Sequence, residues 1–420
     1  MTPDAELPVW AREDAFPEAG PGWGWVDRKG RRQEVDSFEE LARAIVEDAG
    51  ARVDLVWTPE ARGYVLPEEI PGLHSALRES RIRWARWEIE EGKRQMMVFG
   101  GISAVMVLWS YFSTGRILAS GSVGLAVLLF FLLGFLPWYQ GQKRLKRAKR
   151  WAAGEMAADA QVLRFETWLA IQKAPATRLV FRLMAVVGIV QLFAELQVYN
   201  HRHGLEGAKA LLGVWHYVIS FGSLDTFGTT VAEAGLTKYA GGVPKSEWWR
   251  LLTAPFLHGH WLHWLMNASA MVYLGKRVEC FARWPHMVMV LLLSMWIGGE
   301  ASARFLDKPS VGISGGLMGL LGFLLVFETM HRKLVPESAR RRLLAGIVMT
   351  GVLGYVFRHF IDNACHAGGL VAGMMYAAVV FPKSSSIHRP GTTSADLVLG
   401  GAALGLLIAS ALLACVKMIG

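Results

Sequence analysis

Charged residues are scarce in this sequence of 420 residues. They make up 19% of the chain, whereas 53% of the residues are hydrophobic and the mean hydropathy is +0.30. These values exclude a soluble globular protein of this length and indicate several membrane spans with one polar region. Cysteine is scarce as well: Cys280, Cys365 and Cys415 lie far apart without metal-ligand spacing. This spacing argues against a disulfide framework.

The N-terminus lacks an early apolar run, because the first long one begins only at Met96. We therefore expect no signal peptide and a cytoplasmic N-terminus. The net charge of +9 could suggest binding to nucleic acid. However, the basic residues flank apolar segments, so the sequence indicates the lipid bilayer, and not nucleic acid, as the partner.

Residues 1–92 are polar and predict a small cytosolic α+β domain. "GWGWVDRKGRRQEV" predicts two strands around a turn at Lys29-Gly30, and "RVDLVW" predicts a third strand. Between them, "SFEELARAIVEDAG" predicts a helix with Ser37 as its N-cap and Gly50 at its end. The domain shows no ligand-spaced cluster of His, Cys or carboxylates and no phosphate loop. We interpret it as a regulatory or docking module whose partner the sequence does not name.

A helix from Ser75 to Arg94 leads from this domain to the membrane. Four of its arginines either meet anionic lipid headgroups or form a solvated face. They are Arg78, Arg81, Arg83 and Arg86.

Apolar segments of about the length of a bilayer span then recur along the chain. They lie at 96–113, 119–138, 179–197, 257–275, 285–303, 311–330, 343–357, 364–381 and 395–417. The basic stretch "KRLKRAKR" follows the second segment, and Lys276 with Arg277 falls between two later ones, which puts these loops inside. The segment 198–250 then lies outside, and the spans at 257–275, 311–330 and 364–381 all run from outside to inside.

These three spans carry polar residues near their outer ends. Ser314, in "GISGGLMG", has two interpretations: Gly315 and Gly319 form a G-x-x-x-G pair for helix packing, or Ser314 is a nucleophile with small neighbours. His366 is either a packed, hydrogen-bonded histidine or a general base that takes the proton of Ser314. Asp362 lies four residues before His366 and either orients it or lies at the surface of the helix mouth.

The span at 257–275 carries "HGHWLHWLMN". His263 and Asn267 are four residues apart and share a helix face, so they could stabilise an oxyanion or form a polar packing network. A metal site formed by His258, His260 and His263 is a weaker alternative, because no carboxylate accompanies the histidines and the spacing of His258 and His263 is unfavourable.

Taken together, these residues resemble the rhomboid family. Gly312-Ile313-Ser314-Gly315, followed by Gly322, resembles the family's G-x-S-G serine motif. Ala364-Cys365-His366-Ala367, with Gly369 and Gly373, resembles its histidine helix. "EWWRLLTAPFLHGHWLHWLMN" resembles its first outer loop and H-x-x-x-x-H-x-x-x-N helix. The resemblance covers about residues 178–382, and the three motifs in this order are jointly specific.

The resemblance implies an all-α polytopic membrane protein with a six-helix rhomboid core at 178–382. A transmembrane hairpin and basic cytosolic linker at 93–177 would precede the core, after the small α+β domain, and one extra helix at 383–420 would follow it. The location implied is a multi-pass position in the bacterial inner membrane, with the active site opening to the extracytoplasmic side.

The resemblance also implies an intramembrane serine endopeptidase that cleaves transmembrane protein substrates without a metal or other cofactor. Ser314 would be the nucleophile and His366 the base. His263, Asn267 and the Ser314 backbone N–H would form the oxyanion hole. Supporting positions would be His258, Gly312, Gly315, Gly369 and Gly373.

Two other functions remain as alternatives. The first is a non-catalytic rhomboid-like protein that binds or guides membrane clients. Such a protein has no need of all four of the residues Ser314, His366, His263 and Asn267, and all four are present. The second is a transporter, against which the sequence shows neither an evident charged pair in mid-membrane nor an inverted repeat.

Overall fold

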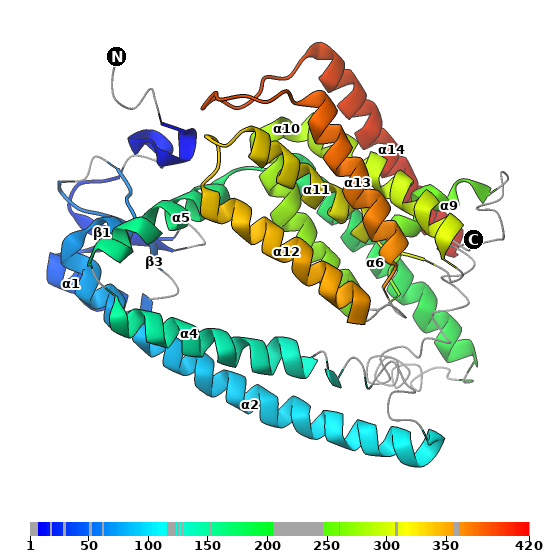
Figure 1. Cartoon of the computed structure of the whole chain (residues 1–420), viewed down its shortest axis with the longest axis horizontal. Coiled ribbons are helices and arrows are strands. Elements are labelled where there is room, and N and C mark those ends of the chain that lie inside the picture. The colour runs from blue at the N-terminus through cyan, green and yellow to red at the C-terminus, as the bar shows by residue number, and fades with distance from the viewer. Residues whose placement is uncertain are drawn as a thin grey trace. The chain divides into compact units, whose positions relative to one another are not determined.

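The computed structural model divides the chain into two compact units, Met1–Ala170 and Ile171–Gly420. The described residues are 7–16, 19–27, 31–49, 53–60, 63–115, 123, 126–127, 129–151, 153–202, 204, 247–259, 261–306, 310–356 and 361–419. The predicted turn at Lys29-Gly30, the helix end at Gly50, His260 and most of the outer segment at 198–250 lie outside them. Figure 1 shows the elements of each unit.

The first unit contains the predicted α+β fold. Strands β1 (Trp23–Asp27), β2 (Arg32–Val35) and β3 (Val53–Trp57) form an antiparallel sheet in the order β2-β1-β3. Helix α1 (Phe38–Ala44) begins as the sequence predicts, since Ser37 Oγ accepts the Glu40 N–H at 3.2 Å. It continues into a short π-helix at Ile45–Ala49. Short 3₁₀ turns lie at Val9–Ala11, Glu13–Ala15, Pro67–Glu69 and Pro71–Leu73.

The predicted charged helix and the first predicted span form one continuous helix, α2 (His74–Thr114). It packs along a π-helical segment, Phe130–Phe135, and helix α4 (Leu136–Arg150), in the same unit. A Cβ at Gly92 would lie 2.6 Å from Trp138 N, and one at Gly134 would lie 2.7 Å from Met96 Cγ. These glycines therefore permit the close approach of the two arms of the hairpin. The start of the predicted span at 119–138 lies largely outside the described residues.

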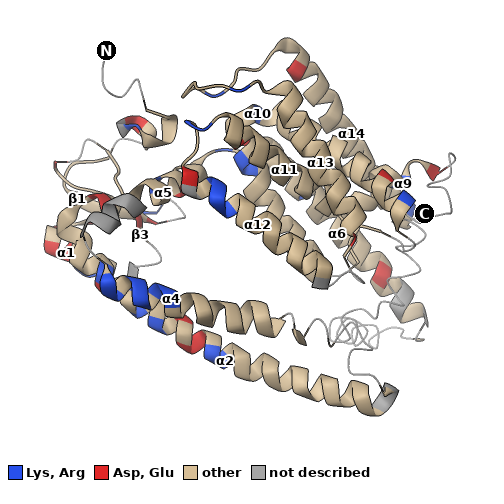
Figure 2. Cartoon of the chain, viewed as in Figure 1, with Lys and Arg blue, Asp and Glu red and all other residues tan. Residues whose placement is uncertain are grey.

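Of the four arginines of α2 named above, Arg78, Arg83 and Arg86 are exposed, which agrees with a solvated face, and Arg81 is half-buried. Three of the four also make contacts that the sequence did not reveal. Arg81 pairs with Glu68, Arg78 donates to the carbonyls of Ala148 and Lys149, and Arg83 donates to the carbonyl of Glu47. These bonds join α2 to the end of α4 and to the α+β fold. Figure 2 shows Lys and Arg gathered on α4 and the adjoining stretch of α2.

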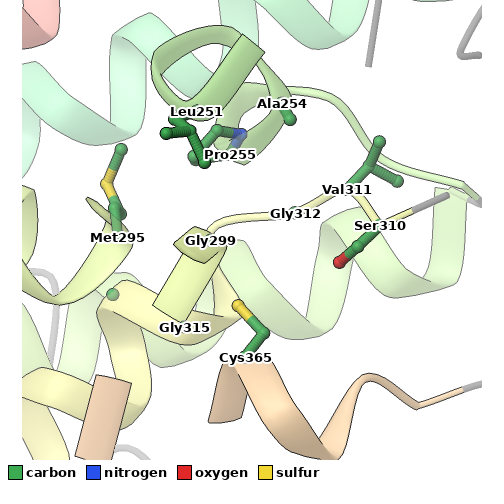
Figure 3. Close-up of a pocket in the computed structure, with 11 residues that line it drawn as sticks. Leu251, Ala254, Pro255, Met295, Gly299, Ser310, Val311, Gly312, Gly315 and Cys365 are labelled. Atoms are coloured by element: carbon green, nitrogen blue, oxygen red, sulfur yellow. The ribbon is translucent and has the colours of Figure 1, made fainter. Parts of the chain in front are cut away.

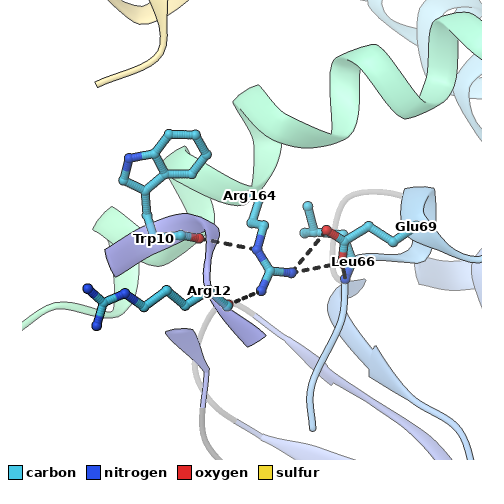
Figure 4. A network of polar contacts seen from close by, with 5 residues as sticks. All are labelled: Trp10, Arg12, Leu66, Glu69 and Arg164. Carbon is cyan, nitrogen blue, oxygen red and sulfur yellow. Dashed lines mark hydrogen bonds and ion pairs between the residues drawn. The ribbon is translucent and has the colours of Figure 1, made fainter. Parts of the chain in front are cut away.

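Helix α5 (Ala153–Ile171) is fastened to the α+β fold by one guanidinium. Arg164 donates to the carbonyls of Trp10 and Arg12 and forms an ion pair with Glu69 at 2.9 Å (Figure 4). Trp10 also packs edge-on against Phe165, with ring centroids 5.7 Å apart. The first unit therefore extends beyond the α+β sequence and through most of the predicted basic linker, to Ala170.

The second unit is a bundle of helices. They are α6 (Pro175–Arg202), α9 (Arg250–Thr253), α10 (Trp261–Phe305), α11 (Ser314–Met330), α12 (Glu337–Val356), α13 (Asn363–Val380) and α14 (Ser394–Ile419), with a 3₁₀ turn at Ala254–Phe256. Helix α10 contains the predicted span 257–275 from Trp261 onward and the predicted span 285–303 as two arms. They meet at Arg283, whose φ of 73° breaks the helix just before Pro285.

Five helical segments among the described residues are long and apolar enough to cross a membrane. They are Pro71–Phe112, Pro175–Gln197, Trp261–Phe305, Asn363–Val380 and Ser394–Ile419. Helix α11 is equally apolar in character but shorter. The structure is thus mostly helical with one small sheet, as the sequence predicts.

The loop position predicted for Arg277 is wrong. Arg277 was expected in an inside loop, but it lies within α10, fully buried, and forms two hydrogen bonds of 2.7 and 2.9 Å to the carboxylate of Glu328 on α11. Tyr273 accepts a further bond from the same guanidinium. The pair could not be predicted from a local sequence pattern, because its members are 51 residues apart. A buried ion pair of this kind needs both partners, since removal of one leaves an uncompensated charge.

Candidate active site

Ser314 is the first residue of α11 and follows a tightly held loop. Gly312 in this loop has a φ of 111°, a conformation that favours glycine, and its N–H donates to the carbonyl of Ala254 at 3.0 Å. The loop therefore fixes where the helix begins. Because the first N–H groups of a helix have no partner within it, the Ser314 N–H is available to a ligand.

His366 lies in the first turn of α13, and its ring meets Ser314. The distance between His366 Nε2 and Ser314 Oγ is 2.8 Å, and both side chains are half-buried. The hydroxyl can donate to the imidazole nitrogen when that nitrogen carries no proton. The structure thus brings together two residues that are 52 positions apart in the sequence.

Glycines allow α11 and α13 to approach closely enough for this bond, and Figure 1 shows the two helices side by side. A Cβ at Gly369 would overlap the carbonyl oxygen of Gly315, and one at Gly373 would overlap that of Gly319. The two interpretations of "GISGGLMG" are therefore compatible, since the glycines serve packing while Ser314 faces His366.

The polar residues of the first arm of α10 lie beside the same loop. A Cβ at Gly312 would lie 2.7 Å from His263 Cε1 and 3.3 Å from Asn267 Nδ2. The rings of His258 and His263 are 5.1 Å apart. The loop of Gly312, the start of α10 and the segment that carries His258 thus meet at a point two residues before Ser314.

The hydrogen bonds of His258 define its role. Its Nδ1 lies 3.2 Å from the Phe256 carbonyl, and its Nε2 lies 3.0 Å from Asn267 Nδ2. A carbonyl only accepts, so Nδ1 carries the proton and Nε2 accepts from the Asn267 amide. Both ring nitrogens are then engaged, and His258 holds Asn267 without a nitrogen left for a ligand. Within the described residues no cluster of three or more His, Cys, Asp or Glu is arranged to hold a metal. His260 lies outside them.

Asp362 makes contacts that the sequence did not reveal. Its carboxylate caps α13 by accepting the Cys365 N–H at 2.8 Å, and it accepts hydrogen bonds from Ser302 and Ser310. Asp362 therefore links the end of α10, the loop before Ser314 and the helix of His366. Asp362 thus lies at the mouth of its helix, as one of the two alternatives had it, but it is half-buried and bonded, not exposed. The available signal was its place just before a helix, where Asp is a favoured N-cap.

A small pocket lies next to the serine loop (Figure 3). Leu251, Ala254 and Pro255 form one side of it, and Cys365 reaches it from α13. Gly312 and Gly315, which flank Ser314 in the sequence, also line it. Its cavity volume of about 20 Å³ is enough for one water molecule. The wall formed by 251–255 was not among the predicted site residues.

Comparison with known proteins finds relatives for the part of the chain that contains this site. A family model described as the rhomboid domain matches residues 245–383. Rhomboid protease GluP of Bacillus subtilis is 32% identical over 148 residues, which are 35% of this chain and 29% of that protein. RHOMBOID-like protein 7 of Arabidopsis thaliana is 32% identical over 200 residues, 46% of this chain and 63% of that protein. RHOMBOID-like protein 6, mitochondrial, also of Arabidopsis thaliana, is 30% identical over 160 residues, 38% of this chain and 52% of that protein. The matches thus span less than two thirds of each relative.

Proposed function

Because the chain belongs to the rhomboid family of integral membrane proteins, we propose that it is an intramembrane serine endopeptidase that cleaves membrane-anchored proteins. The observation that carries the proposal is the 2.8 Å distance between Ser314 Oγ and His366 Nε2. A serine hydroxyl is a weak nucleophile at neutral pH unless a base accepts its proton, and this distance is within hydrogen-bond reach.

In the proposed reaction, Ser314 Oγ attacks the carbonyl carbon of the scissile peptide bond while its proton passes to His366 Nε2. The tetrahedral intermediate collapses as the C–N bond breaks, and His366 returns the proton to the departing amine. Water then attacks the acyl-enzyme ester, again with His366 as the base, and releases the second product and the free serine.

The negative charge of the intermediate requires donors beside Ser314. The Ser314 N–H at the start of α11, Asn267 Nδ2 and His263 are the donors that we assign to this oxyanion. The placement of Asn267 and His263 against Gly312 supports the assignment. Gly312 leaves room there because it has no side chain.

The proposed substrates are transmembrane proteins. A helical segment exposes no carbonyl to a nucleophile until it unwinds, so helix-breaking residues near its membrane boundary should favour cleavage. We assign the protein to a bacterial inner membrane, with residues 1–92 in the cytoplasm and the site opening on the opposite side, on the strength of the basic stretch in α4.

The test is cleavage of a membrane-anchored reporter by the full chain. We expect Ser314→Ala to abolish cleavage with unchanged expression. Ser269→Ala is the matched control, because this serine lies exposed on α10 with its hydroxyl bonded to the Leu265 carbonyl. Equal cleavage by wild type and Ser314→Ala would contradict the proposal. Reporter binding without cleavage by either protein would favour the non-catalytic alternative.

A further inference from the structure

The side chain of Gln191, on α6, is bonded to the backbone that precedes α10. Its Nε2 donates to the His258 carbonyl at 2.7 Å, and its Oε1 accepts the His258 N–H at 3.0 Å. Gln191 is buried, with 4% of its surface exposed. One amide thus satisfies both backbone groups of His258, which have no helix or strand to pair them. Removal of the amide would leave two buried polar groups without this partner.

His258 in turn holds Asn267 through its ring. Of the two hydrogens on Asn267 Nδ2, one is directed to His258 Nε2, which leaves one to point elsewhere. The same Nδ2 lies 3.3 Å from the position that a Cβ on Gly312 would occupy. The direction of the free N–H is therefore set by His258, whose backbone is set by Gln191.

We propose that Gln191 is a positioning residue of the oxyanion hole and acts through His258 on Asn267. This inference rests on the proposed function. It assigns a role to α6, which lies outside the residues 245–383 that match the rhomboid domain. An oxyanion donor stabilises the transition state only when it is held in place beforehand, so a loosened Asn267 lowers kcat more than it changes KM.

The test compares the kinetics of peptide-bond hydrolysis for three variants of the full chain in detergent. Gln191→Met keeps the volume of the side chain and removes both bonds to His258, and Gln191→Ala removes the volume as well. Trp264→Phe is the control. Trp264 Nε1 donates to the Met184 carbonyl, so this substitution removes a different hydrogen bond between α6 and α10. We expect kcat to fall about 10- to 100-fold in both Gln191 variants, with KM within about twofold of wild type. Trp264→Phe should keep the wild-type kcat.

A double variant separates positioning from general destabilisation. If Gln191 acts through Asn267, Gln191→Met in the Asn267→Ala background should cost less than about twofold, because the donor that it positions is already gone. Independent contributions would instead multiply, and that result would overturn the inference, as would an unchanged kcat in Gln191→Met. If wild type shows no hydrolysis that depends on Ser314, the proposed function fails first and the inference fails with it.

Discussion

Asn267, on α10, carries a larger share of the proposed chemistry than His258, which lies just before that helix. His258 has both ring nitrogens engaged, by the Phe256 carbonyl and by Asn267, and so has no donor left for an oxyanion. Asn267 is buried and retains one amide hydrogen. Among the three polar side chains that the sequence placed together, the structure thus separates a supporting residue from the two proposed donors.

Asn267→Ala should slow hydrolysis without abolishing it. Loss of one oxyanion donor typically costs about 3 kcal/mol, which corresponds to a fall of roughly a hundredfold in kcat, while His263 and the Ser314 N–H remain. The measurement is kcat for a peptide or reporter substrate, beside Ser269→Ala on the exposed side of the same helix. A wild-type kcat in folded Asn267→Ala would rule out the oxyanion role and favour a packing role.

The residues that the sequence could predict are those with a local pattern. Ser314 and His366 stand in short motifs with flanking glycines, and His263 and Asn267 follow the helical period. Asp362 has no such pattern. Two of its partners, Ser302 and Ser310, lie 60 and 52 residues away, so its connections depend on the tertiary fold. Gln191 was not predicted for the same reason, since its partner His258 is 67 residues away.

Helices α11 and α13 must stay in contact if Ser314 is to reach His366. They approach closely at two pairs of glycines, Gly315 with Gly369 and Gly319 with Gly373. Helix α13 has no charged residue, and α11 has only Glu328, which is already paired with Arg277. Steric fit therefore decides the separation of the two helices, and charge contributes little along their shared face.

Gly373→Ala should impair both stability and turnover. The added Cβ would overlap the Gly319 carbonyl, and overpacking of this kind costs about 1–3 kcal/mol. The helices would have to separate two turns from His366, which lengthens the bond to Ser314. Gly405→Ala on α14 is the matched control, since a Cβ there meets no atom within 4 Å. Thermal unfolding in detergent and kcat are the measurements. If the two variants behave alike, close packing at Gly373 is not required.

The sequence predicted the ends of helices and strands well where an apolar stretch or a cap residue marks them. It predicted them less well where two segments of different composition join into one helix. The strands and α1 begin where turn and cap residues predicted them. Helix α2 was predicted as two pieces because its polar and apolar parts differ in composition, yet nothing between Arg94 and Met96 interrupts the backbone pattern. The arms of α10 were separated correctly, because Pro285 marks the break next to Arg283.

In the whole molecule, each of the two units is held together by hydrogen bonds and ion pairs of its own. Arg164 fastens α5 to the α+β fold within the first unit. Within the second unit, Glu279 on α10 accepts the N–H groups of Ala176 and Thr177 at the start of α6. The first turn of α6 is therefore capped by residues of its own unit.

A chain truncated to residues 171–420 should retain peptide-bond hydrolysis. All the proposed site residues and the Glu279 cap lie in this part, whereas a cut near Lys93 would divide α2. We expect kcat within about threefold of the full chain, because no proposed group of the reaction is lost. Client choice in cells is the property that we expect to change. A well-folded truncated chain without activity would show that the first unit takes part in the chemistry.

The central claim is that Ser314 is an activated nucleophile, and labelling with a fluorophosphonate probe tests it most directly. The probe reacts covalently with an activated serine, and the labelled residue is read by mass spectrometry of the purified protein. The account predicts a single label on Ser314 in wild type and in Ser269→Ala, and none in Ser314→Ala. It also predicts loss of label in His366→Ala, because the base is gone. A folded wild-type protein that takes no label, or equal labelling of Ser314→Ala, would contradict the account.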